Sequence, residues 1–223
     1  MATRLDNSVL EENDIHGILK ILADSTAAEY ENGRTWYRRA NRFAKKVAAL
    51  SGKDPATVAA VIARLSPQVA WSDNRIAAFE ICCGLDARPA CGKCYPDNVT
   101  RAEDIARDNC ADTIAREVLP RKGYARPKIS AFFQNIADPD IDGIATVDTW
   151  AIRVWVGDCT ADAYTVTAKQ SRKIQADYVA AARIAGLLSH ELQAIVWVAA
   201  HRLAKESLQR SLFNIGIGLA FKI

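Results

Sequence analysis

Residues 119–154, LPRKGYARPKISAFFQNIADPDIDGIATVDTWAIRV, carry the most information about fold and chemistry. The stretch opens with an irregular basic turn, passes through a short apolar segment at 128–136 that favours a helix, and then enters a loop rich in Asp, Pro and Gly. Asp148 follows this loop, and aspartate is a preferred cap for a helix, here one ending near Gly157. The stretch therefore predicts two helices, the second with a carboxylate at its start.

The turn that opens this stretch, before the helix at 128–136, is cationic. It holds Arg121, Lys122, Arg126 and Lys128 around Gly123. Backbone N–H groups in such a turn and at the start of the next helix can point at a phosphate, and the cations add attraction for a polyanion. The turn therefore predicts contact with a nucleic-acid backbone.

Helical patterns dominate the rest of the chain, and no strand, repeat or low-complexity tract is expected. Thr100 and Glu103 match a capping box that would open one helix reaching residue 119. The expected helices span 14–23, 34–50, 54–65, 71–83, 100–119, 128–136, 148–157, 172–187 and 190–208. We predict an all-α fold in which residues 1–223 form a single compact domain. The domain can consist of two lobes, and the loop at 91–98 is the expected boundary between them.

Composition describes an ordinary globular protein. The chain has 223 residues, 50% hydrophobic and 25% charged, with a net charge of +3, so bulk charge alone does not identify a nucleic-acid binder. No apolar run reaches the ~18 residues that a membrane span needs, and the polar N-terminal segment does not match a signal peptide. We expect a cytoplasmic monomer that does not enter membranes.

The six cysteines are expected to be reduced thiols, since no secretion signal favours a disulfide framework. Cys91 and Cys94 form a close thiol pair in a turn. Together with Cys83 and Cys110 they leave open a structural zinc site with four thiolates, although such sites usually have two close pairs. The main expectation is that no metal or cofactor is bound.

Two motifs follow each other along the chain. Leu-Ser-Pro-Gln at 65–68 is followed by Asn74, and Val-Asp-Thr-Trp at 147–150 is followed by Arg-Val at 153–154; Leu-Pro at 119–120 and Arg-Pro-Lys at 126–128 lie between them. This arrangement resembles the helix-hairpin-helix, Gly/Pro-Asp superfamily of DNA glycosylases, of the endonuclease III type. It is also similar to small phage-encoded members of that superfamily without assigned activity, which would place the protein in a host cytoplasm.

The resemblance implies a two-lobed, glycosylase-like fold with a degenerate helix-hairpin-helix motif, its hairpin and catalytic segment at about 119–156. It implies an enzyme that binds double-stranded DNA, flips out a damaged or modified base and cleaves the N-glycosidic bond. Asp148 would stabilise positive charge on the sugar or activate the nucleophile, and Lys128 would be a Schiff-base lysine for lyase activity. DNA contacts would come from Gln68, Arg121, Lys122, Gly123, Arg126 and Arg153, and the base pocket from Trp71, Asn74 and Trp150.

Other functions stay open. Trp150 stands where the superfamily has a histidine, and the hairpin is altered, which fits a phage enzyme that hypermodifies a flipped base. A third hypothesis is a helix-hairpin-helix module that binds DNA without catalysis. Asp148 would then be only a helix cap. The ladder Arg34, Arg38, Arg42 and Lys46 is expected to be a solvated helix face, with phosphate contact as its alternative.

Overall fold

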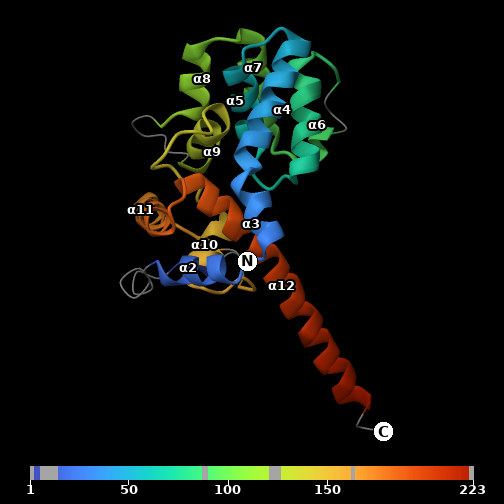
Figure 1. Ribbon diagram of the computed structural model, residues 1–223. Helices are drawn as coiled ribbons and strands as arrows, with labels where there is room; N and C mark the ends of the chain where they lie inside the picture. The colour runs from blue at the N-terminus through green and yellow to red at the C-terminus, as the bar shows by residue number, and fades with distance from the viewer. Residues whose placement is uncertain (1–2, 6–14, 87–89, 121–126, 162–163, 221–223) are drawn as a thin grey trace. The chain divides into compact units, whose positions relative to one another are not determined.

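The computed structural model describes residues 3–5, 15–86, 90–120, 127–161 and 164–220. These residues form eleven α-helices, which confirms the predicted all-α fold (Figure 1). The chain divides into two compact units: unit 1 comprises Met1–Thr35 and Val147–Ile223, and unit 2 comprises Trp36–Thr146. The loop at 91–98, expected as a lobe boundary, lies inside unit 2.

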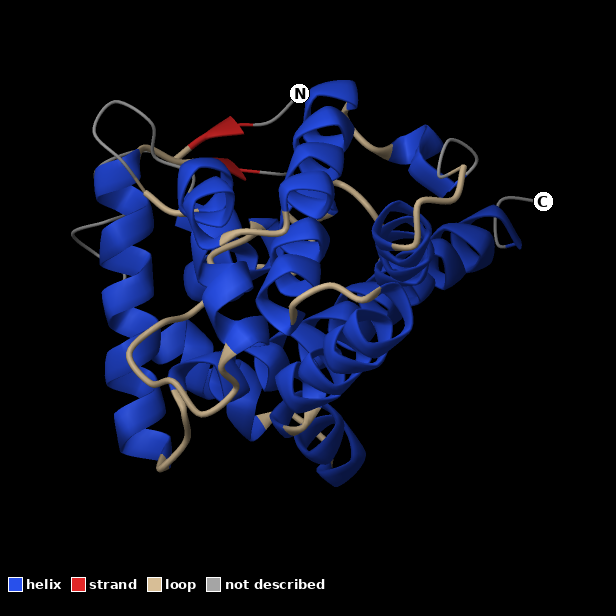
Figure 2. Cartoon of the chain, turned by 90° about the horizontal axis from the view of Figure 1, so that it is seen from above, coloured by secondary structure: helices blue, strands red, loops and turns tan. Residues whose placement is uncertain are grey.

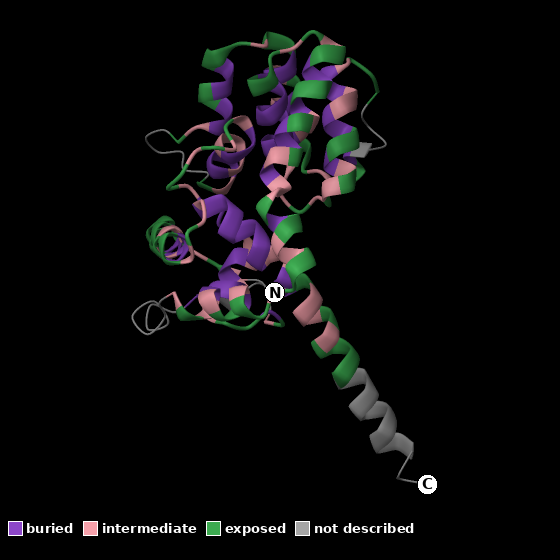
Figure 3. Cartoon of the chain, in the orientation of Figure 1, coloured by how far each residue is buried: buried purple, intermediate pink, exposed green. Residues whose placement is uncertain are grey.

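Unit 2 is built around one buried helix, α5 (Pro55–Leu65), in which every residue from Thr57 to Leu65 is buried (Figure 3). Helix α5 packs against five neighbouring helices, so its apolar surface is removed from water on all sides. Those neighbours are α4 (Trp36–Ser51), α6 (Trp71–Cys82), α7 (Pro96–Asp108), α8 (Ala111–Val118) and α9 (Pro127–Ala137), and a 3₁₀ turn, η1 (Ala90–Lys93), follows α6.

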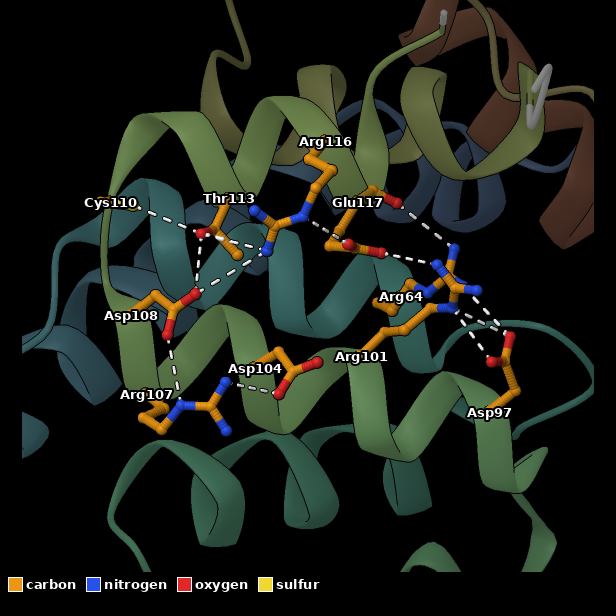
Figure 4. Close-up of polar contacts among 10 residues, drawn as sticks. All are labelled: Arg64, Asp97, Arg101, Asp104, Arg107, Asp108, Cys110, Thr113, Arg116 and Glu117. Atoms are coloured by element: carbon orange, nitrogen blue, oxygen red, sulfur yellow. Dashed lines mark hydrogen bonds and ion pairs between the residues drawn. The ribbon is translucent and has the colours of Figure 1, made fainter. Parts of the chain in front are cut away.

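The one charged residue of α5, Arg64, is fully buried and is held by α7 and α8 (Figure 4). Its guanidinium donates to the Glu117 carbonyl oxygen at 3.3 Å and lies 3.6 Å from the Asp97 carboxylate. Burial alone would raise the pKa of Glu117, but hydrogen bonds from Arg101 and Arg116 outweigh it and lower that pKa. A buried cation needs such compensation, because an unpaired one is very costly.

Unit 1 contains α2 (His16–Ala23), α3 (Ala27–Arg34), α10 (Thr149–Val156), α11 (Ala168–Ala185) and α12 (Ser189–Ala220). Two close backbone approaches hold these helices together. A Cβ added to Gly33 would overlap the Ile195 Cα, and one added to Gly17 would lie 2.7 Å from the Val154 carbonyl oxygen. Glycine is therefore required where α3 crosses α12 and where α2 meets the end of α10.

The expectation of no strands is wrong in one detail. Strands β1 (Thr3–Arg4) and β2 (Tyr164–Thr165) pair in parallel, and Figure 2 shows them in red. Each strand has two residues, too short for the alternating pattern by which a strand is found in a sequence. Gln170 adds to this contact by donating its side-chain N–H to the Leu5 carbonyl oxygen at 3.0 Å.

Two helix predictions also need correction. The expected helix at 100–119 is two helices, because Asn109 adopts a left-handed conformation (φ 45°) that ends α7. Thr100 lies inside α7, where its hydroxyl donates to the Pro96 carbonyl oxygen one turn earlier, so it does not cap. Helix α3 was not predicted, although Thr26 and Glu29 form a complete capping box at its start.

The basic ladder is also different from the expected one. Arg34 belongs to α3 and pairs with Glu31 at 3.8 Å, whereas the other three residues lie on α4 in unit 2. Arg38 forms an ion pair with Asp140 at 2.7 Å, and Arg42 and Lys46 are exposed.

No single helix of the described chain is long and apolar enough to cross a membrane. Helices α11 and α12 satisfy the length and composition test only as a pair, bent by 95° at their junction.

We predict that Gly33→Ala destabilises the protein by about 3 kcal/mol, at the upper end of the cost of overpacking, because its methyl group would meet the backbone of Ile195. Gly92→Ala is the matched control, since its Cβ would meet nothing within 4 Å. Its effect should stay within about 0.5 kcal/mol. Urea unfolding measures the free energy of unfolding of both variants. Equal unfolding midpoints for Gly33→Ala and Gly92→Ala would contradict the close crossing of α3 and α12.

Candidate active site

Asp148 stands at the start of α10, as the sequence predicted. Its extended backbone precedes the helix, and its carboxylate accepts a hydrogen bond from the Ala151 N–H at 2.8 Å. Gly157 ends the helix in a left-handed conformation (φ 82°), also as predicted. The positive end of the helix dipole favours the ionised carboxylate, which is half-buried. This geometry places a fixed negative charge at the surface of unit 1.

Trp150 and Arg153 lie beside each other one turn into the same helix. The Arg153 guanidinium carbon is 4.6 Å from the centre of the Trp150 ring, a cation–π arrangement. Both side chains are half-buried, and the buried Nε of Arg153 makes no hydrogen bond with the described residues. Arg153 was predicted to contact DNA and Trp150 to line a base pocket; the structure brings the two together but leaves both roles as predictions.

Helix α12 contributes an imidazole to this group. The His201 ring lies 3.9 Å from the Trp150 ring and 4.3 Å from the Trp197 ring, between centroids. Although His201 is exposed, partial desolvation lowers its pKa; the nearby Asp148 carboxylate opposes that shift, and the Arg153 cation adds to it. The lowered pKa favours the neutral imidazole, which can both accept and donate a proton.

Helix α11 fixes α10 from its buried side. The fully buried Tyr178 donates its hydroxyl hydrogen to the Ala151 carbonyl oxygen at 3.0 Å. Burial, and then the charge of Asp148, raises the pKa of Tyr178, so the phenol keeps its proton. Trp155, also buried, donates its indole N–H to Asp177 at 2.8 Å. The bond to Ala151 holds the first turn of α10, next to Asp148, and the bond from Trp155 holds its last turn.

The sequence analysis missed His201, Trp197 and Tyr178 as members of this group. His201 and Trp197 are four residues apart, which places them on one face of α12, but this spacing is equally common in ordinary amphipathic helices. Only the packing of α12 against α10 makes the pair informative. Together, the site offers a carboxylate, a neutral imidazole, a guanidinium and an indole face, a set suited to stabilising a cation or moving a proton.

The remaining predicted site residues belong to unit 2. Gln68 is exposed in the turn between α5 and α6 and has a left-handed backbone (φ 63°), which is uncommon for a residue other than glycine. Lys128 is half-buried in the first turn of α9. Trp71 begins α6 in a cluster of rings, and the buried Asn74 amide donates to the Ile62 carbonyl oxygen at 3.0 Å. Asn74 thus ties α6 to α5, whatever further role it has.

The predicted hairpin contacts Arg121, Lys122, Gly123 and Arg126 lie outside the described residues. The possible zinc ligands are only partly together. Cys91 and Cys94 hydrogen-bond to each other, and burial raises the pKa of Cys91 to about 12. Cys110 instead bonds to Thr113 at 3.4 Å. In the part of the chain that the structure describes, no three His, Cys, Asp or Glu side chains gather as a metal site.

We predict that His201 titrates with a pKa below 6.5. Because the unfolded chain binds this proton more readily, the contribution of His201 to stability is lost as the pH falls through its folded-state pKa. Arg153→Gln should raise this pKa and Asp148→Asn should lower it. Histidine NMR spectra measure the titration, with the signal assigned by its loss in His201→Gln. An ordinary pKa that neither variant changes would contradict this geometry.

Residues 2–204 match a family of unknown function, DUF7178. No curated protein and no solved structure matches the chain. Because the match covers most of the sequence, the chain belongs to the DUF7178 family.

Proposed function

We propose that this protein binds double-stranded DNA and cleaves the N-glycosidic bond of a base turned out of the helix. The observation that carries the proposal is the position of Asp148, an anionic side chain held at the N-terminus of a short helix beside a guanidinium, an indole and a neutral imidazole. The resemblance of the flanking sequence to DNA glycosylases supports the same chemistry. The family itself brings no assigned activity.

In this reaction, the bond between the sugar carbon C1′ and the base nitrogen breaks, and its electron pair leaves with the base. The sugar develops positive charge, which the Asp148 carboxylate would stabilise electrostatically. Water then forms the new C1′–O bond, and its proton is transferred to the departing base. The Trp150 face would stack on the flipped base, and Arg153 would pair with a phosphate oxygen.

Two residues of unit 2 complete the proposal. Gln68 would fill the gap left by the flipped base, and its exposed side chain and uncommon backbone conformation support that role. Lys128 would supply the amine for a Schiff base with the sugar in a lyase step, which borohydride reduction would trap as a covalent protein–DNA adduct.

One observation favours a second candidate function. The hydrogen bond from Ala151 to Asp148 accounts for an aspartate at this position as a helix cap, without any chemistry. A protein that binds DNA without cleaving it would therefore keep the same residue. The two functions differ in what the charge of Asp148 does once DNA is bound.

We predict that wild-type protein releases a free base from duplexes carrying damaged or modified bases, and that Asp148→Asn lowers the rate by roughly 100-fold or more. Asparagine caps helices about as well as aspartate, so the variant removes the charge while keeping α10. Asp158→Asn is the matched control: it makes the same chemical change in the turn after α10, where Asp158 accepts a hydrogen bond from the Thr160 N–H.

Mass spectrometry of the products separates the candidates. Detection of an altered base that is still attached to its sugar would favour base modification over cleavage as the function. Binding without any product would favour the non-catalytic function, and equal rates in wild type and Asp148→Asn would remove Asp148 from the chemistry. If the protein neither binds these duplexes nor forms a product, the nucleic-acid assignment is contradicted for the substrates used.

A further inference from the structure

A second surface, in unit 2, combines aromatic rings with exposed cations. It lies along α4 and α6, and we call it the aromatic–cationic face. Its rings are Trp36, Phe43 and Trp71, and its cations are Arg39, Arg42, Lys46 and Arg75. The sequence analysis assigned Trp71 to the base pocket; the other residues of this surface have no role in the chemistry proposed for Asp148.

The Trp71 ring on α6 contacts both rings of α4. The Trp71 ring lies 4.9 Å from Trp36 and 6.2 Å from Phe43, between centroids. All three residues are half-buried, and Tyr37 and Phe132 also pack against the Trp36 ring. The guanidinium carbon of Arg75 is 5.8 Å from the Trp71 ring and 5.7 Å from Phe43, which extends the aromatic surface with a planar cation.

The cations follow the rings along α4. Trp36, Arg39, Phe43 and Lys46 succeed one another at intervals of three or four residues, which places them in a single row on the helix surface. Arg42 flanks this row, and Arg39, Arg42, Lys46 and Arg75 are all exposed. Helix α4 carries no acidic residue from Trp36 to Ser51. The row therefore presents positive charge directly beside aromatic rings.

This combination fits one class of partner. A polyanion would be attracted by the cations, but a regular duplex hides its bases in its own stack and offers the rings nothing to contact. A single strand has accessible bases, which stack on aromatic side chains while the phosphates meet the cations. An acidic peptide would pair with the cations and leave the rings unused.

We propose that the aromatic–cationic face binds single-stranded nucleic acid, with bases stacked on Trp71 and its neighbouring rings and phosphates held by Arg39, Arg42 and Lys46. This goes beyond the proposed function, which concerns a duplex and bond cleavage, with roles for Asp148, Gln68 and Lys128 but none for the cations of this face. Accessible bases and phosphates are offered both by a duplex strand that has been locally opened and by an independent single strand.

Fluorescence anisotropy with labelled oligonucleotides tests the proposal. The full-length protein is titrated with a 12-nucleotide oligothymidine, the matching oligouridine, a duplex of the same length and a polyglutamate peptide. The single strands should bind more tightly than the peptide, and the comparison between oligothymidine and oligouridine tells whether DNA or RNA is preferred. Peptide binding as tight as that of the single strands would overturn the proposal.

Two variants examine the two halves of the surface. Trp71→Leu keeps an apolar side chain in place and removes the stacking ring, and it should weaken single-strand binding about tenfold, within the range measured for one stacked base. Arg42→Ala combined with Lys46→Ala should weaken binding and reduce the slope of log K against log salt by about 1.4, the value for two lost phosphate contacts on a single strand. Circular dichroism checks that both variants stay helical.

Lys169→Ala combined with Arg172→Ala is the matched control, because it removes two exposed cations from α11 in unit 1. It should leave single-strand binding within twofold of wild type. An equal loss in this control, or unchanged binding in Trp71→Leu, would overturn the proposal. Base release without single-strand binding would overturn this inference and leave the proposed function standing; single-strand binding without base release would do the reverse.

Discussion

The hydrogen bond from the Ala151 N–H to the Asp148 carboxylate decides where α10 begins, and the candidate site depends on that point. Helix α10 has only eight residues, and a helix this short is not stable alone in water. It persists because Asp148 caps its start, Gly157 ends it, and Ala151, Ile152, Val154 and Trp155 are buried against the rest of unit 1. The cap thus fixes both the carboxylate and the residues next to it.

Asp148 therefore has two roles, one as a helix cap and one as a negative charge. As a cap, it needs only an oxygen that accepts one hydrogen bond, and asparagine would serve as well. As a charge, it acts on its surroundings: it raises the pKa of Tyr178 and opposes the burial that lowers the pKa of His201. A carboxylate beside a neutral imidazole is the kind of pairing in which two titratable groups take different roles.

The sequence was sufficient for most of the fold, because helix signals in this chain are local. Asp148, Gly157 and the apolar spacing between them define α10 without any knowledge of tertiary structure. Helix α3 was not predicted, because its apolar pattern is weak and its glycine is explained only by tertiary contact. Its sequence, AAEYENGR, has no apolar stripe, and Gly33, a poor helix former, is required there by the backbone of α12, far along the chain. The division of 100–119 at Asn109 depended on one left-handed residue.

The site could be predicted only where its residues are neighbours in sequence. Asp148, Trp150 and Arg153 lie within six residues and were found together, whereas His201 and Tyr178 come from α12 and α11 and are identified by packing alone. The same holds for the aromatic–cationic face. The sequence analysis assigned Trp71 to the base pocket by itself, and its contact with Trp36, which joins α6 to α4, comes from packing.

The role proposed for Asp148 is to stabilise positive charge on a sugar. Its test is the affinity for a duplex carrying a cationic pyrrolidine in place of one sugar, compared with the same duplex carrying a neutral tetrahydrofuran. Wild-type protein should bind the cation at least ~100-fold more tightly, as expected for a transition-state mimic, and Asp148→Asn should bind both duplexes almost equally. Equal affinity of wild-type protein for the two duplexes would contradict it.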